Sequence, residues 1–158
     1  MVIKEKVSKY PSITQVFPRE VYLFWVSHKE TEGTEAMKTR PGIVISVESL
    51  NKWNKRCIIV PATTKKTNLA KIYPFEVKVI IDGKKGKAMV DQLKTYSLGR
   101  IIEKSFMGKI SEKEMEEIQE KIMSACNLWE YLKKISSVKA RAFLAVEIAK
   151  QKHKAWLT

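Results

Sequence analysis

Long apolar runs and cysteine pairs are missing from this sequence. Its 158 residues include only two cysteines, Cys57 and Cys126, which are too few for a disulfide framework or a zinc site and are typical of a reducing cytosol. The longest apolar runs fall far short of the ~20 residues that a membrane-spanning helix needs. The first nine residues carry lysines where a signal peptide would be apolar. These absences argue against a membrane protein, a secreted disulfide-rich protein and a metalloenzyme.

Acidic residues are also scarce, with 17 Asp and Glu against 30 Lys and Arg and a formal net charge of +13. The excess lies mainly in residues 1–110, which carry +11, whereas residues 111–134 carry −2 and residues 135–158 carry +4. A basic surface attracts phosphates or acidic proteins, and it can equally serve solubility alone. Charge therefore predicts a polyanionic partner without identifying it.

Short apolar segments separated by turn residues predict antiparallel β-structure in the first two-thirds of the chain. The predicted strands are 21–26, 43–47, 58–62, 75–79 and 87–90. Asp82-Gly83 marks a two-residue hairpin between the last two strands. Short strands closed by turns favour a small barrel, and the long polar loop over residues 27–41 is of a length that is usually functional or mobile.

The hydrophobic period then changes to that of a helix. Ser111 and Glu114 form a capping box, and apolar residues recur every three or four positions from Met115 to Leu132. This spacing predicts one amphipathic helix of about six turns packed on the barrel. Cys126 lies near its apolar face and is expected to be buried. A second helical stretch is predicted over residues 141–154.

Three segments carry the residues best suited to chemistry. They are Gly33-Thr-Glu-Ala-Met-Lys-Thr-Arg-Pro41; Ile59-Val-Pro-Ala-Thr-Thr64 followed by Tyr73-Pro-Phe-Glu-Val77; and Met89-Val-Asp-Gln-Leu-Lys-Thr95 followed by Arg100 and Gly108-Lys-Ile-Ser-Glu112. In this order and spacing, the set resembles the MazF/PemK family of toxin endoribonucleases over roughly residues 20–132. Three collinear segments are a far more specific signal than one.

The resemblance implies an α+β, mainly β fold: an SH3-like antiparallel β-barrel of the PemK and CcdB type, with a long C-terminal helix and a possible extra one. The predicted domains are an N-terminal extension at 1–18, the barrel and its helix at 19–134, and a basic, helical extension at 135–158. The family consists of homodimeric toxins that cleave single-stranded RNA without a metal or cofactor. The 2′-hydroxyl attacks the adjacent phosphorus, which leaves a cyclic phosphate and a 5′-hydroxyl, and an acidic antitoxin restrains the activity.

The resemblance assigns catalytic positions to Arg40, Thr63, Glu35 and Asp91. Arg40 offers a charged planar fork for phosphate oxygens, and Thr63 offers a hydroxyl donor just past a strand. Glu35 either orients Arg40, accepts a proton or is an ordinary solvated carboxylate. Asp91 acts either as a general base or by holding the backbone in place through hydrogen bonds.

Further residues are candidates for contacting RNA, although each is equally explicable as a surface group. They are Thr64, Lys65, Lys66, Gln92, Lys94 and Arg100. The sequence departs from the family where Arg19-Glu20 replaces the usual Gly-Asp and where Ala36 replaces the loop Gln. The expected partners are single-stranded RNA, an acidic antitoxin and a second copy, in the cytoplasm and without a membrane.

Two alternatives remain open. One is a CcdB-like toxin directed at gyrase, because the chain ends in Lys154-Ala-Trp-Leu-Thr158 and such toxins use C-terminal residues. The other is a non-catalytic basic barrel that binds RNA, because Ala36 cannot make the hydrogen bonds of a glutamine.

Overall fold

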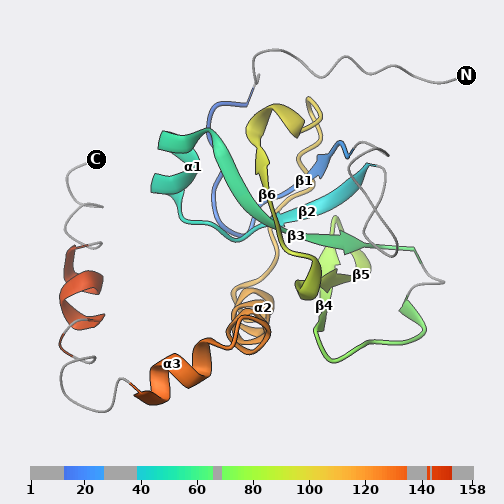
Figure 1. The fold of residues 1–158 in the computed structure, drawn as a ribbon. Coiled ribbons are helices and arrows are strands. Elements are labelled where there is room, and N and C mark those ends of the chain that lie inside the picture. The colour runs from blue at the N-terminus through green and yellow to red at the C-terminus, as the bar shows by residue number, and fades with distance from the viewer. Residues whose placement is uncertain (1–12, 27–38, 66–68, 135–141, 143, 151–158) are drawn as a thin grey trace, which may run out of the picture. The chain divides into compact units, whose positions relative to one another are not determined.

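The computed structural model describes residues 13–26, 39–65, 69–134, 142 and 144–150 (Figure 1). It divides into two compact units, residues 1–122 and residues 123–158. The predicted limits of the three domains stay a prediction.

Six antiparallel strands form the body of the first unit. They are β1 (Val21–Phe24), β2 (Arg40–Val44), β3 (Arg56–Thr63), β4 (Glu76–Ile81), β5 (Lys84–Met89) and β6 (Lys94–Ser97). Their order is β1-β2-β3-β5-β4, and β6 also pairs with β3. The predicted class, α+β and mainly β, is confirmed. Among the described strands, the outermost two, β1 and β4, do not pair with each other, so the sheet stays open.

The shorter elements differ most from the expectation. Helix α1 (Glu48–Asn54) and strand β6 were not predicted. The 3-10 helices η3 (Val90–Gln92) and η4 (Leu98–Arg100) flank β6. The predicted hairpin at Asp82-Gly83 is confirmed: Ile81 pairs with Lys84, and both turn residues have positive φ, as a two-residue turn of this type requires.

Two apolar clusters lie on opposite faces of the central strands, because successive side chains of a strand alternate. The first core consists of Val21, Ile43, Val60, Ala62, Val77, Val79, Ile81, Ala88, Val90, Ile110, Met115 and Ile118. The second core consists of Val16, Tyr22, Phe24, Val44, Cys57, Ile59, Leu98 and Ile101. Burial of the Cys57 thiol raises its pKa to about 12. On β1, β2 and β3, residues that face away from the first core therefore share the side of the second.

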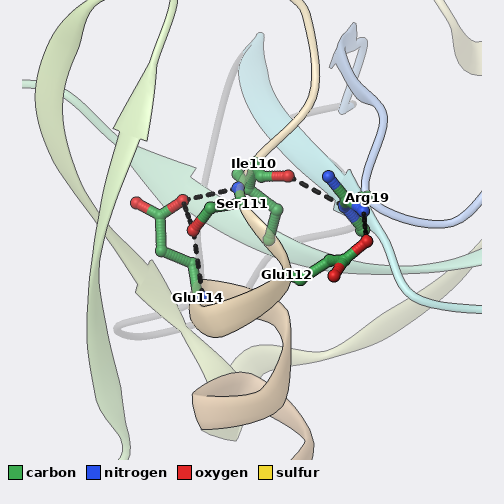
Figure 2. A network of polar contacts seen from close by, with 5 residues as sticks. All are labelled: Arg19, Ile110, Ser111, Glu112 and Glu114. Carbon is green, nitrogen blue, oxygen red and sulfur yellow. Dashed lines mark hydrogen bonds and ion pairs between the residues drawn. The ribbon is translucent and has the colours of Figure 1, made fainter.

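Helix α2 (Glu112–Ala125) covers the first core through Met115 and Ile118. Figure 2 shows the network at its start, which we call the cap network: Arg19, Ile110, Ser111, Glu112 and Glu114. The Ser111 and Glu114 side chains accept each other's backbone N–H groups, at 3.2 Å and 2.7 Å, so the predicted capping box is confirmed. Glu114 Oε1 also accepts the backbone N–H of Ile80 in β4 at 2.7 Å.

Arg19 stands where the resemblance expects glycine, and its φ of 75° is positive. Few residues other than glycine adopt this conformation without strain. Two bonds at 2.9 Å hold Arg19 there, one to the Ile110 carbonyl and one to the Glu112 carboxylate. The departure from the family pattern thus has a local structural compensation.

The prediction of one helix of about six turns was wrong. Helix α2 ends at Ala125, and α3 (Leu128–Lys134) begins after a turn. Asn127, with φ 55°, adopts the left-handed conformation that asparagine tolerates at helix ends, and its N–H bonds to the Ser124 carbonyl at 3.2 Å. Cys126 lies in this turn and is exposed, so its predicted burial was also wrong. Residues 144–150 are helical, as predicted for part of 141–154.

Candidate functional site

Arg40 and Thr63 come to the same end of the central strand pair. In the antiparallel ladder of β2 and β3, Gly42 pairs with Pro61, and Val44 pairs with Ile59. Arg40 is the first residue of β2 and Thr63 is the last residue of β3. Because the two strands are antiparallel, these residues lie at the same end of the strand pair, each two positions beyond the Gly42–Pro61 pair. Two residues 23 positions apart in the sequence are thereby brought to one end of the sheet.

Lys87 extends this pair to a third strand. In the ladder of β3 and β5, Thr63 pairs directly with Lys87, so both lie on the face turned away from the first core. Arg40 at the start of β2, Thr63 at the end of β3 and its partner Lys87 in β5 come from three adjacent strands, and we call this set the Arg40–Thr63–Lys87 row. It places a cation on each side of a hydroxyl.

Thr63 lines a pocket of about 290 Å³ and is only 3% exposed. Its Oγ1 accepts the backbone N–H of Lys65 at 3.3 Å. The pocket is lined by Thr63, Ala70, Lys71, Tyr73, Glu76, Lys87 and Met89. Strand β5 approaches closely here: a Cβ added to Gly86 would stand 2.8 Å from the Thr63 carbonyl oxygen. Glycine at 86 is therefore required for the present position of Thr63 against β5.

Lys87 and Glu76 form an ion pair within this pocket, with Nζ and Oε2 2.8 Å apart. Their side chains are 7% and 11% exposed. Lys87 Nζ also donates to the Lys71 carbonyl at 3.1 Å, and Glu76 Oε2 accepts the Tyr73 N–H at 2.8 Å. Sequence analysis assigned neither side chain a role. The alternation of residues 75–79 places Glu76 off the apolar face, but its partner, Lys87, is 11 residues away in the chain.

Arg40 is half-buried at the end of the second core. It shares a cavity of about 10 Å³ with Phe24, Val26, Pro41, Ile59, Pro61 and Tyr96. Arg100 lies on the same side, since its Cζ is 5.1 Å from the centroid of the Tyr96 ring. Lys94 pairs with Ile59, a residue of the second core, and so shares its face. The fold thus brings two of the predicted RNA contacts, Lys94 and Arg100, to the side of Arg40.

The remaining candidates are placed less centrally or lie outside the described residues. Thr64 and Lys65 follow directly on the end of β3, half-buried and exposed respectively. Asp91, exposed, and Gln92, half-buried, lie on η3 after β5. The carboxylate of Asp91 makes no hydrogen bond to any described residue, so its proposed backbone-holding role gains no support there. Glu35 and Lys66 lie outside the described residues, as does Ala36.

The described part of the chain contains no group of three or more His, Cys, Asp or Glu placed to hold a metal ion. None of its helices is long and apolar enough to cross a bilayer.

Comparison with known proteins gives a consistent result. Residues 18–126 match the family profile of the PemK-like, MazF-like toxins of type II toxin-antitoxin systems. The endoribonuclease toxin MazF of Escherichia coli K12 is 33% identical over 100 residues, which cover 63% of this chain and 86% of that protein.

Solved structures share the fold at lower identity. MazF from Deinococcus radiodurans superposes with a TM-score of 0.57 at 21% identity, over 72% of this chain and 97% of that one. A mycobacterial endoribonuclease in complex with its cognate antitoxin gives a TM-score of 0.57 at 16% identity, over 72% and 96%. The family match covers most of the chain and includes every strand that carries the row. The chain belongs to the PemK-like, MazF-like toxins of type II toxin-antitoxin systems.

Proposed function

We propose that this toxin is an endoribonuclease that cleaves single-stranded RNA at the Arg40–Thr63–Lys87 row. The single observation that supports it best is the antiparallel pairing of β2 and β3, which brings to the same end of the strand pair the two residues that the family motifs point to. Its MazF relative carries the name endoribonuclease toxin. A guanidinium beside a hydroxyl on rigid strands is an arrangement suited to holding a phosphodiester.

The proposed reaction is an internal transfer at phosphorus. The 2′-oxygen of one ribose forms a bond to the adjacent phosphorus as its proton leaves to a base. The bond from phosphorus to the 5′-oxygen of the next ribose breaks, and that oxygen takes up a proton. The products are a 2′,3′-cyclic phosphate and a 5′-hydroxyl, with no other reactant consumed.

Arg40 and Thr63 supply the donors that this reaction needs. Negative charge grows on the non-bridging oxygens in the transition state, and fixed donors aimed at them lower the barrier. The Arg40 guanidinium is always charged and binds two oxygens at once, so we propose that it takes the place of a metal. The Thr63 hydroxyl can donate to an oxygen while it accepts the Lys65 N–H, because a hydroxyl both donates and accepts.

Two carboxylates are proposed for proton transfer or orientation. Asp91 is exposed on η3, where it has room to exchange a proton with the 2′-hydroxyl. Glu35 precedes Arg40 by five residues and is proposed to orient it. Thr64, Lys65, Lys66, Gln92, Lys94 and Arg100 are proposed contacts for the flanking nucleotides.

The partners proposed are those that the family and the charge favour. With +11 over residues 1–110, the chain attracts both RNA and an acidic antitoxin. A mycobacterial relative of the same fold was solved with its cognate antitoxin. We propose that the toxin is a cytoplasmic homodimer held inactive by such an antitoxin.

The test is cleavage of a long single-stranded RNA by the purified protein in EDTA, beside Arg40→Ala. We expect defined cuts with 5′-hydroxyl ends, and a loss of about 10²–10³ in rate for the variant. Sequencing of the new 5′ ends gives the recognition motif. Equal cutting by both proteins would overturn the assignment of Arg40, and RNA that is bound but never cut would overturn the proposal and favour a binding-only barrel.

A further inference from the structure

The pocket beside Thr63 contains a buried ion pair, Lys87 and Glu76, to which the proposed reaction at Arg40 and Thr63 assigns no role. Lys87, Glu76 and Met89 all lie on the face of β4 and β5 that turns away from the first core, as Thr63 does on β3. Thr63 itself lines the pocket, so a phosphodiester that contacts Thr63 would lie next to it.

The Lys87 ammonium retains capacity to bind an anion. An ammonium has three N–H donors, and within the described part of the chain two of them have acceptors, Glu76 Oε2 and the Lys71 carbonyl. Glu76 holds the ammonium in place while it accepts the Tyr73 N–H. Apolar residues can often replace a buried ion pair without loss of stability. The pair therefore suits anion binding in addition to holding the backbone of Lys71 and Tyr73.

Tyr73 adds an aromatic surface to the pocket wall. Tyr73 is 53% exposed. Two ammonium groups lie near the ring, with Lys71 Nζ 4.8 Å and Lys87 Nζ 5.4 Å from its centroid. Exposed aromatic rings combined with cations are the means by which proteins bind single-stranded nucleic acid, because the ring stacks on a base and the cations contact the backbone.

We propose that this pocket binds one nucleotide of the RNA substrate, next to the bond that is cut. Tyr73 stacks on the base, and Lys87, held by Glu76, contacts a phosphate oxygen. The volume of about 290 Å³ lies at the lower end of the ~300–1,000 Å³ typical of small-molecule pockets, which suits one nucleotide and no longer segment. The inference rests on the proposed function for its substrate, and it assigns Lys87 and Tyr73 to substrate binding.

A binding role predicts a particular kinetic pattern. Interactions made equally in the ground state and in the transition state change KM and leave kcat alone. Tyr73→Ala should therefore raise KM about 5- to 150-fold, the range that loss of one base stack gives, with little change in kcat. Tyr73→Phe keeps the ring and should restore most of the affinity that Tyr73→Ala loses.

Lys87 is tested with its partner, because either single variant would leave a lone buried charge. The double variant K87M/E76Q keeps both volumes and removes both charges. For binding to single-stranded RNA, the slope of log K against log salt should fall by about 0.7, the value for one lost phosphate contact. Lys113→Met is the matched control. It removes one charge at an exposed position on α2 that does not line the pocket, so it should leave the slope unchanged.

The experiment measures binding and cleavage separately. Binding is followed by fluorescence anisotropy with a pool of 2′-fluoro single-stranded RNA, which lacks the nucleophile, and thermal melting checks the fold of each variant. The pocket proposal is overturned if Tyr73→Ala binds and cuts like Tyr73→Phe, or if K87M/E76Q keeps the wild-type salt slope. If the wild type binds the pool but cuts no RNA, the proposed function fails, while the same variants still decide whether the pocket binds RNA.

Discussion

The cap network at the start of α2 and the pocket beside Thr63 contain the same kinds of group in different surroundings. Each has a cation paired with a glutamate, a glutamate that accepts a backbone N–H, and a hydroxyl that accepts another. The side chains of Arg19 and Glu112 are 32% and 83% exposed, whereas those of Lys87 and Glu76 are 7% and 11% exposed.

We interpret this difference in exposure as one between a cluster that stabilises a helix start and a cluster that is suited to binding. A helix start leaves N–H groups without partners, so Ser111 and Glu114 satisfy a need that any helix would have there. The ladder of β4 and β5 satisfies its own backbone, and the Lys87–Glu76 pair binds two backbone groups before β4, the Tyr73 N–H and the Lys71 carbonyl. Apolar residues can often replace a buried ion pair without loss of stability, so its presence beside Thr63 favours a role in binding as well.

Removing one carboxylate from each ion pair should give the largest contrast. Glu76→Ala leaves the Lys87 ammonium buried without its partner, which we expect to lower the free energy of unfolding by about 3–5 kcal/mol. Glu112→Ala, at an exposed pair, should cost at most about 1 kcal/mol. Urea unfolding at pH 7 measures both. Equal small losses would show that the pocket pair is effectively solvated.

Removing one hydroxyl from each site should separate catalysis from folding. Thr63→Val should lower the rate of RNA cleavage by about 10²–10³-fold, because one donor to the transition state is lost. Ser111→Ala should leave that rate unchanged, although its Oγ accepts a backbone N–H at 3.2 Å much as Thr63 Oγ1 does at 3.3 Å. Single-turnover cleavage of the mapped RNA tests both, and a normal rate for Thr63→Val would remove Thr63 from the mechanism.

Adding one methyl group near each site should sharpen the contrast further. A Cβ at Gly86 would meet the Thr63 carbonyl oxygen at 2.8 Å, so Gly86→Ala should cost about 1–3 kcal/mol of stability and also slow cleavage. Gly108 has φ +90° with nothing within 4 Å of an added Cβ. Gly108→Ala should therefore cost stability of about 1–2 kcal/mol through backbone strain alone, with cleavage kept. Thermal melting and cleavage assays on the two variants decide it.

The smallest effect is expected for the helix cap alone. Ser111→Ala removes a side-chain cap and should lower the free energy of unfolding by about 1 kcal/mol. Its affinity for the 2′-fluoro RNA pool should match that of the wild type. A weakened affinity would mean that the start of α2 contacts RNA, which would end the distinction between the two clusters.

The sequence predictions that proved correct depend on interactions between residues close together in the chain. The hairpin at Asp82-Gly83 and the capping box of Ser111 and Glu114 each depend on residues at most three positions apart, and both are confirmed. The match over residues 18–126 confirms the predicted family. The roles of those two residues, and of the other candidate site residues, stay predictions.

The failures share a different cause. The spacing of apolar residues continues past Ala125, so this period alone predicts one helix. It gives no sign that Asn127 adopts a left-handed conformation, which ends the helix. Strand β6 consists of Lys-Thr-Tyr-Ser, which has too few apolar residues to predict a strand. It forms because it pairs with β3, and such pairing can outweigh the strand propensity of the residues themselves.

The sequence by itself determined the local turns and caps, the basic charge and the family to which the chain belongs. Only the tertiary structure decided that Arg40, Thr63 and Lys87 share one row, and that Glu76 is the partner of Lys87. The physical reason is register: pairing between strands distant in the chain sets which side chains are neighbours, and a shift of one residue would turn each of them to the other face. Residues that are close in the sequence determine turns and helix caps. The candidate site depends on contacts between distant strands, which only the folded sheet provides.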